Sequence, residues 1–369
     1  MGKKLVNYVI ILAGILSLSL FALKGLPTLR ISDEVLLSFS VTSDSQANIQ
    51  DPETPVQDKK WGVNSKAFNR IVDEITEQRP DMLFFCGDGI SGYTQGNRDE
   101  LDNQYAFLRG IESRLFEKGI YVFPVEGNHE MQDINPKNSR TSAQVSNEEA
   151  WRENNGDILP NKELWEKILK TPFASSAWRD INFARIGDDS VSTDQSKLSY
   201  SFDLKGTHFI VVNTYAVGSE SSVPLERLKE DIFDARRRGM KHIFIFGHQP
   251  AFTYKYDKDT APRGLDLNLL SRDRFWKLIN ESKATYFCGH DHLFDASQPS
   301  GGEAYQIIVG PSGGEFHTQE PVTNPNLMKF SWATVKVYKS GKVHIDAYGF
   351  GQDYGKTIVL KCWELHNGY

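Results

Sequence analysis

The sequence contains little cysteine, no excess of positive charge and no internal repeat. Only 3 of the 369 residues are cysteines, too few for a disulfide scaffold. The formal net charge is −6, so the basic surface that nucleic-acid binding requires is missing and no nucleic-acid partner is expected. With 39% hydrophobic and 24% charged residues, the composition is that of an ordinary globular protein. These features exclude a small disulfide-rich domain and a largely disordered chain.

The three cysteines are expected to be structural residues rather than reactive ones. Cys86 and Cys288 each end an apolar run and directly precede a glycine. Free buried cysteine behaves as a small hydrophobic residue, so both are expected to be free and buried, with a bridge between them as the alternative. Cys362 lies in a late apolar run and is also expected in the core.

The one long hydrophobic run of the chain lies near its beginning, from Leu5 to Leu23, behind Lys3 and Lys4. Its length is about that of a bilayer-spanning helix and exceeds most signal-peptide cores. Residues 1–30 are therefore expected to form either a signal peptide or an uncleaved membrane anchor with a linker, and both alternatives stay open. Because basic flanks remain cytoplasmic, the rest of the chain is expected to be extracytoplasmic: secreted, periplasmic or anchored with the domain outside.

Short apolar runs alternate with helical patterns over the first third of residues 31–369. Val35–Val41, Met82–Cys86 and Tyr121–Val125 read as strands, and apolar residues recur at helical spacing between them. This alternation predicts an α/β fold with a mainly parallel sheet. Polar residues 131–197 interrupt the pattern and are expected to form an insertion over the mouth of the site. Further strands are expected at 198–204, 209–213, 242–246 and 284–288 and beyond residue 305. Further helices are expected at 224–238 and 272–280.

Five of the predicted strands end in side chains that can bind metal ions. Sites in open α/β sheets lie outside the carboxyl ends of strands, so these five loops are expected to meet there. The segments are Asp44, Gly87-Asp88, Gly127-Asn128-His129-Glu130, Gly247-His248 and Gly289-His290-Asp291-His292.

The chemistry of these side chains points to a pair of metal ions. Carboxylates, an amide and imidazoles, without a thiolate, suit Mn, Fe or Zn. Two carboxylates leave a pair of divalent ions with about two positive charges, enough to attract a phosphate. Two such ions about 3.5–4 Å apart can bind an anionic ester and lower the pKa of a bridging water. His129 is not needed as a ligand, and we expect it to protonate the leaving group as a general acid.

The five segments resemble the motifs of the calcineurin-like metallophosphoesterase family, over about residues 35–315 without the insertion. The resemblance implies a two-sheet β-sandwich flanked by helices, in four layers, with a dinuclear metal centre. It implies that Asp88 bridges the two ions and that a metal-bridging hydroxide attacks phosphorus. By the family pattern one ion would be held by Asp44, Asp88 and His292, and the other by Asp88, Asn128, His248 and His290.

Two positions depart from the commonest pattern of that family. Gln46 stands where a histidine is usual, so it would be a weaker, neutral ligand or would only orient a water. Ser91 stands three residues after Asp88, where the purple acid phosphatase branch has a tyrosine, and Tyr93 follows two residues later. A tyrosinate-bound ferric ion is therefore not expected. Glu130 is expected to orient the ring of His129 or His290.

These observations predict a metal-dependent hydrolase that acts on a small phosphate ester, in the first place a phosphomonoesterase. A phosphodiesterase acting on nucleotide or lipid-derived diesters is the alternative within the enzyme class. The competing class is a non-catalytic binding protein in which Gln46 weakens one metal site. Substrate, metal identity and oligomeric state are left open by the sequence.

Overall fold

The computed structural model describes residues 33–135, 138–174, 178–180, 191–254, 263–317 and 327–365. By its contacts the chain divides into Met1–Glu34 and a larger unit, Val35–Tyr369, and the account below concerns the larger unit. The predicted signal peptide or anchor lies outside the described residues. Among the helices that are described, none is long and apolar enough to cross a bilayer.

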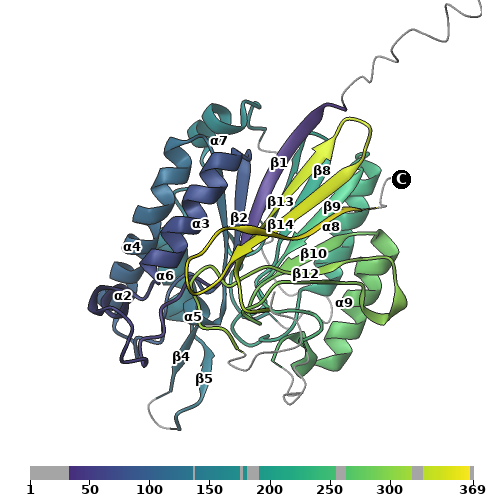
Figure 1. The fold of residues 1–369 in the computed structure, drawn as a ribbon. Helices are drawn as coiled ribbons and strands as arrows, with labels where there is room; N and C mark the ends of the chain where they lie inside the picture. Colours follow the sequence, from purple (N-terminus) through teal and green to yellow (C-terminus); the bar gives the residue numbers. More distant parts are fainter. Residues whose placement is uncertain are drawn as a thin grey trace, which may run out of the picture. The chain divides into compact units, whose positions relative to one another are not determined.

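Two β-sheets form the centre of this unit (Figure 1). The first has the strand order β15-β14-β13-β1-β2-β3, and the second β11-β12-β10-β9-β8-β7-β6. The strands of the first are β1 (Val35–Thr42), β2 (Met82–Cys86), β3 (Tyr121–Val125), β13 (Phe330–Tyr338), β14 (Val343–Phe350) and β15 (Ile358–Leu365). Those of the second are β6 (Trp178–Asp180), β7 (Tyr200–Leu204), β8 (Thr207–Val211), β9 (His242–Phe246), β10 (Thr285–Cys288), β11 (Asp295–Ser297) and β12 (Gln306–Ile308).

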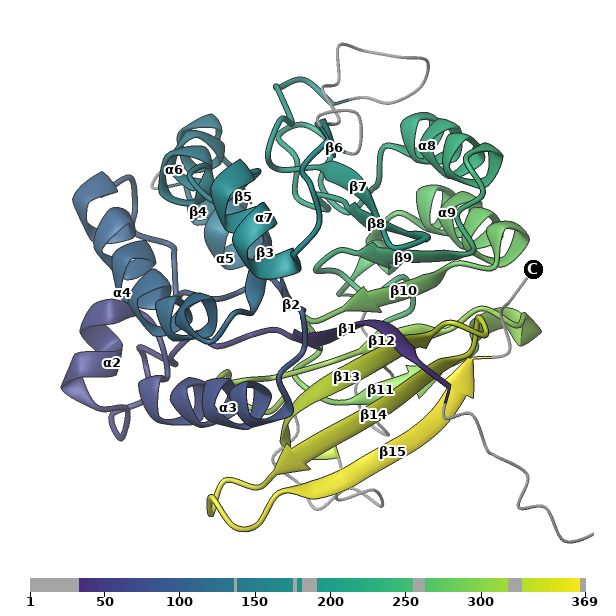
Figure 2. The same ribbon diagram turned by 90° about the horizontal axis from the view of Figure 1, so that it is seen from above.

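Parallel pairing joins β1, β2 and β3 in one sheet and β8, β9, β10 and β12 in the other. Antiparallel strands extend both sheets. Four long helices lie on the outer faces: α3 (Ser65–Gln78), α4 (Arg98–Glu117), α8 (Leu225–Arg237) and α9 (Leu269–Ser282). Figure 2 shows α3 and α4 on one side of the strands and α8 and α9 on the other. The predicted sandwich of two sheets between helical layers is confirmed.

The local sequence accounts for these elements. All five residues of β2 are buried, as expected for a parallel strand covered on both faces. In α3, the residues at helical spacing, among them Phe68, Ile71 and Ile75, are the buried ones. The side chain of Asn64 caps the first turn of α3, and the helix ends at Arg79, just before Pro80.

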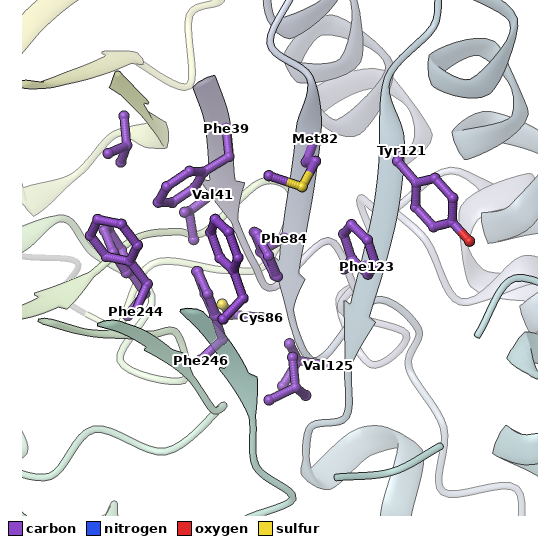
Figure 3. Packing of buried hydrophobic residues seen from close by; sticks show 14 of the residues in the cluster. Phe39, Val41, Met82, Phe84, Cys86, Tyr121, Phe123, Val125, Phe244 and Phe246 are labelled. Carbon is purple, nitrogen blue, oxygen red and sulfur yellow. The ribbon is translucent and has the colours of Figure 1, made fainter. Parts of the chain in front are cut away.

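Aromatic rings fill the space between the two sheets (Figure 3). Phe84 of β2 stacks on Phe246 of β9, with ring centroids 3.8 Å apart and planes within 4°. Phe39 of β1 packs edge-on against Phe84 at 5.6 Å and against Phe244 at 5.0 Å. This layer fixes the strands of one sheet against those of the other, so the loops at their ends are held at defined distances.

The structure departs from the expectations in three places. Residues 45–62, where the sequence shows no helical spacing of apolar residues, contain the helix α2 (Val56–Trp61). Cys362 is exposed rather than in the core, because β15 is the last strand of its sheet, while Cys86 and Cys288 are free and buried as expected. The region 131–197 is more regular than expected and holds, among its described residues, β4 (Gln132–Ile134), β5 (Thr141–Ala143), α6 (Val145–Asn155), α7 (Lys162–Leu169) and β6.

Candidate metal centre

The five predicted loops meet at one edge of the two sheets. They follow β1, β2, β3, β9 and β10 and are joined by backbone hydrogen bonds: the Asp44 amide donates to Gly87 O at 2.9 Å, and the Gly289 amide to His248 O at 3.0 Å. Several of the predicted ligands have a positive φ, including Asp44 (58°) and Asp88 (55°). Non-glycine residues in this conformation are costly and often mark functional sites.

A first cluster contains Asp44, Asp88 and His292, whose ligand atoms all lie within 4.8 Å of one another. His292 Nε2 is 3.3 Å from Asp44 Oδ1. The amide of Gln46 joins this cluster, because its Nε2 is 3.1 Å from His292 Nε2 and 3.3 Å from Asp88 Oδ2. Gln46 Oε1 is buried and has no hydrogen-bond partner among the described residues.

A second cluster contains Asp88, His248 and His290, again with ligand atoms within 4.8 Å of one another. His248 Nε2 is 3.1 Å from Asp88 Oδ2. Asn128 contributes its Oδ1, which is 3.1 Å from His290 Nδ1. Asp88 is thus the carboxylate that the two clusters share, and all seven predicted ligand residues come together.

Glycines allow the loops to approach this closely. A Cβ atom on Gly87, whose φ is 83°, would lie 2.6 Å from His248 Nδ1. A Cβ on Gly289 would lie 2.5 Å from Asp44 Oδ2. Both distances are shorter than carbon can tolerate, so the glycines adjoining the ligands are needed for space.

The three ligand histidines are oriented by backbone carbonyls on their outer sides. His248 Nδ1 lies 2.7 Å from Cys86 O, and His292 Nδ1 contacts Glu315 O. His290 is turned the other way, with Nε2 3.1 Å from Arg263 O. When each outer nitrogen donates its proton to the carbonyl, the inner nitrogen carries a lone pair, as in metal-bound histidines. His248 Nε2 and His290 Nδ1, which then both present lone pairs, are only 3.2 Å apart.

The electrostatics of the two clusters also favour a cation. Burial alone would lower the pKa of His248, but Asp88 raises it to about 10. Burial and the neighbouring His248 lower the pKa of His290 to about 3. Burial would raise the pKa of Asp88, but His248 and His129 hold it below its usual range. The raised pKa of His248 and the lowered pKa of Asp88 favour positive charge beside Asp88, whereas the lowered pKa of His290 keeps that ring neutral, as a metal ligand must be. The oxygen and nitrogen donors, the facing lone pairs and the unsatisfied Gln46 oxygen fit a pair of metal ions.

His129 belongs to neither cluster and stands at their margin. Its Nδ1 lies 2.6 Å from Ser91 O, and its Nε2 is 3.8 Å from Asp88 Oδ2. The ring packs edge-on against Tyr93 at 4.8 Å, and its side chain is 26% exposed. Tyr93 in turn accepts a hydrogen bond from Asn128 Nδ2 at 2.8 Å, so this tyrosine supports a predicted ligand.

A pocket of about 470 Å³ opens beside His129 and His292. Among the described residues that line it there is no lysine or arginine, and Glu315 is the one acid. The phosphate of a substrate would therefore be neutralised by metal ions rather than by side chains. Most of the other lining residues have neutral polar side chains: Gln46, Asn48, Gln50, Ser91, Tyr93, Gln95 and Thr141.

Sequence reasoning assigned Glu130 a different role and assigned Ser91 none. The buried Glu130 carboxylate accepts hydrogen bonds from the amides of Asp88 at 2.9 Å, Gly89 at 2.7 Å and Gly127 at 2.7 Å, so it ties two ligand loops together rather than orienting a histidine. Its place three residues after Gly127, as in a capping box, was the available signal. Ser91 is buried and donates to Ala47 O at 2.7 Å, which makes it part of the loop scaffold.

Comparisons with known proteins agree with this site. Residues 37–294, more than half of the chain, match the calcineurin-like phosphoesterases. A search of curated proteins found no match. A purple acid phosphatase from yellow lupin (Lupinus luteus) seeds resembles 90% of this chain with a TM-score of 0.56 and 12% identity, and this chain spans only 54% of that enzyme.

A dimetal phosphatase from Danio rerio is similar over 89% of this chain and 99% of its own, with a TM-score of 0.51 and 14% identity. At such low identities these two likenesses show the fold, while the family match adds the motif-bearing loops. The family match and the two ligand clusters imply a dinuclear metal centre and phosphate-ester substrates. The chain therefore belongs to the calcineurin-like phosphoesterase family and, with it, to the metal-dependent hydrolases of phosphate esters.

Proposed function

We propose that this chain is a phosphomonoesterase that holds two metal ions in the two clusters. The observation that supports the pair of ions most directly is the orientation of the histidines. The inner nitrogens of His248 and His290 face each other, His248 also faces the shared Asp88 carboxylate, and the inner nitrogen of His292 faces Asp44. Asp44, Asp88 and His292 would hold one ion, with Gln46 beside it. Asp88, His248, His290 and Asn128 would hold the other. Rotation of the Gln46 amide by half a turn would direct its unsatisfied oxygen toward the first ion.

In this proposal the residues of the chain hold the two ions, keep the ligand loops in place and protonate the leaving group. When bound, the two ions supply Lewis acidity, which polarises the phosphoryl group and lowers the pKa of water. Asp88 would hold both ions, since its Oδ2 lies next to His248 of one cluster and Gln46 of the other, and Glu130 keeps the Asp88 loop in place. His129, whose Nδ1 is held by Ser91 O, presents Nε2 toward the pocket and would donate its proton there to the leaving oxygen.

The assignment of His129 can be tested with two substrates. His129→Ala should lower kcat by about 10²–10⁴-fold while two ions per chain are retained, because the ring is not a ligand. The loss should be larger for an alkyl phosphate than for p-nitrophenyl phosphate, since nitrophenolate leaves without protonation. Steady-state kinetics and metal analysis measure both. Equal losses on the two substrates would show that the ring has only a structural role.

Asp88→Asn is the contrasting variant. Because Asp88 is common to both clusters, its loss should remove both ions and the activity together. Retention of two tightly bound ions would contradict the bridging assignment.

A panel of substrates that includes bis-p-nitrophenyl phosphate tests the ester class. Faster turnover of the diester than of the monoester would replace the phosphomonoesterase proposal by a phosphodiesterase. No turnover in a chain with both ions bound would favour the non-catalytic alternative.

We also propose that the enzyme works outside the cytoplasm. The support is the apolar run Leu5–Leu23 behind Lys3 and Lys4, which suits a signal peptide or anchor. Fractionation of cells that express the full chain, followed by mass determination of its N-terminus, would distinguish a cleaved from an anchored form. Recovery of the full-length chain in the soluble cytoplasmic fraction would contradict the proposal.

A further inference from the structure

A second concave site differs sharply in charge from the pocket beside His129. It is a cavity of about 330 Å³, called here the basic cavity, with Asp81 as the one acid of its lining. Five basic side chains line it: Arg79, Lys118, Lys167, Lys170 and Lys205. In a chain with a net charge of −6, this local excess of positive charge does not follow from composition.

The basic cavity lies at the end of the sheets opposite the metal loops. Asp81 directly precedes β2, and Gly119 precedes β3, whereas the metal loops follow these strands. The lysines of α7 come from the last turn of that helix and the residue after it. Figure 1 shows α7 and α5 (Asn128–Met131) at opposite ends of the molecule. Nothing bound in the basic cavity can reach the proposed catalytic groups.

Most of these positive charges are not neutralised by the protein. Lys205 Nζ lies 3.8 Å from Asp81 Oδ1. Among the described residues, no ion pair is made by Arg79, Lys118, Lys167 or Lys170, and all four are exposed. Cations suit helix C-termini, which explains single basic residues at the ends of α3, α4 and α7. It does not explain why three helix ends and a lysine from the β7–β8 turn converge on one cavity.

The chain enters the larger unit at this same edge. The amide of Ser38, in the first half of β1, donates to Asp81 Oδ2 at 2.7 Å. Residues 1–34, with the apolar run Leu5–Leu23, therefore connect to the fold at the edge that carries the basic cavity. A cluster of basic side chains at the point where the chain joins a fold, following an apolar run in the sequence, is an arrangement that can attract anionic lipid surfaces.

We propose that the basic cavity binds the phosphate groups of anionic lipids, so that this edge lies on a membrane surface and the metal loops face away from it. The cavity can accept a phosphate from several sides, because its cations come from four separate segments. The chemistry of recognition is charge alone, so binding is expected to weaken with rising salt.

The test uses the full chain and two kinds of vesicle, phosphatidylcholine alone and phosphatidylcholine mixed with phosphatidylglycerol. The ratio of the two partition coefficients is measured by sedimentation, because the apolar N-terminal run contributes equally to both and cancels. The variant Lys118→Gln/Lys167→Gln/Lys170→Gln should lower this ratio by about 100-fold, since each of the three lysines near an anionic surface contributes roughly 5-fold. Hydrolysis of soluble p-nitrophenyl phosphate should be unchanged, which verifies folding.

The matched control is Lys60→Gln/Lys229→Gln/Lys356→Gln, three exposed lysines outside the cavity with the same change in net charge. Its ratio should stay near that of the unaltered chain. A ratio that is the same in the cavity variant and the unaltered chain would overturn the proposal. Loss of inorganic-phosphate binding in the cavity variant without a change in the vesicle ratio would also overturn it, and would assign the cavity to a soluble anion.

Discussion

Several predicted ligands of the candidate centre are positioned by residues that are not predicted ligands themselves. Glu130 is 1% exposed, and its carboxylate receives backbone amides from the loop after β2 and from the loop after β3. The carbonyls of Cys86 and Glu315 orient His248 and His292 in the same way. Such contacts decide which ring nitrogen faces the ions, and the loss of one partner leaves buried donors unsatisfied.

At this scale we predict that Glu130→Gln weakens both stability and metal binding. The glutamine keeps the volume but replaces one acceptor oxygen by a donor, so buried amides of Asp88, Gly89 or Gly127 lose their partner. The free energy of unfolding should fall by about 1–3 kcal/mol. Urea unfolding and metal titration measure the two effects. Glu117→Gln, at an exposed position, is the control. A Glu130 variant with the same stability and metal affinity as this control would refute the role of Glu130 in holding the two loops.

At the scale of elements, a buried histidine connects β8 with β7 and α8. His208 Nδ1 is 2.6 Å from Asp203 Oδ1, and Nε2 is 3.0 Å from Asp231 Oδ2. Burial would lower the pKa of His208, but the two carboxylates raise it above the usual 6.5. Burial would likewise raise the pKa of Asp203, whereas His208 and Arg238 lower it below the usual 3.8. The contacts of His208 with these two carboxylates thus connect β8 with β7 and with α8.

The sign of the pH dependence follows from these directions. The contribution of His208 is complete below pH 6.5 and is lost as the pH rises through its raised pKa, while that of Asp203 is complete above pH 3.8 and is lost on acidification. His208→Gln should therefore lower the free energy of unfolding by about 1–3 kcal/mol near pH 6 and by less near pH 9. Urea unfolding with a chelator present measures this.

A control for that experiment is His344→Gln. His344 meets a single carboxylate, that of Asp346 at 3.0 Å, and its side chain is 22% exposed. We expect a small effect at both pH values, because exposed pairs contribute little. If the His208 variant lost the same free energy near pH 6 and near pH 9, the charged network would not exist.

At the scale of the whole molecule, the aromatic layer between the sheets determines whether the five loops meet. Phe84 lies on the strand that leads to Asp88, and Phe246 on the strand that leads to His248. Their rings stack at 3.8 Å, so the distance between these two ligands depends on the packing of β2 against β9 (Figure 3). Stability and metal affinity are therefore coupled.

We predict that Phe84→Ala lowers the free energy of unfolding by about 3–5 kcal/mol, because it leaves a cavity among rings on both sheets. Metal affinity should fall as well, since Asp88 and His248 are carried by the loosened strands. Phe233→Ala, at a position that is 67% exposed, removes the same atoms without a cavity and should change little. A Phe84 variant with reduced stability and unchanged metal affinity would show that the loops are held independently of the core.

The strand ends that carry the candidate site residues could be predicted from the local sequence, because each is an apolar run followed by a metal-binding side chain, mostly with a glycine beside it. These residues are Asp44, Asp88, Asn128, His129, His248, His290 and His292. The local sequence failed for α2, whose six residues lack a clear apolar face, and for Cys362, whose exposure depends on β15 being an edge strand. The spacing of apolar residues indicates which face of a helix or strand tends to be buried, but it does not show whether another element packs against that face.

The sequence by itself determined the family, the order of the motifs and the class of chemistry, because each motif is a short run of adjacent residues. Only the tertiary structure decided which nitrogen of each histidine faces the other predicted ligands, that Glu130 ties two loops together, and that basic side chains from four segments line one cavity. The physical reason is distance along the chain: these groups lie tens to hundreds of residues apart, and only the packing of the two sheets brings them together.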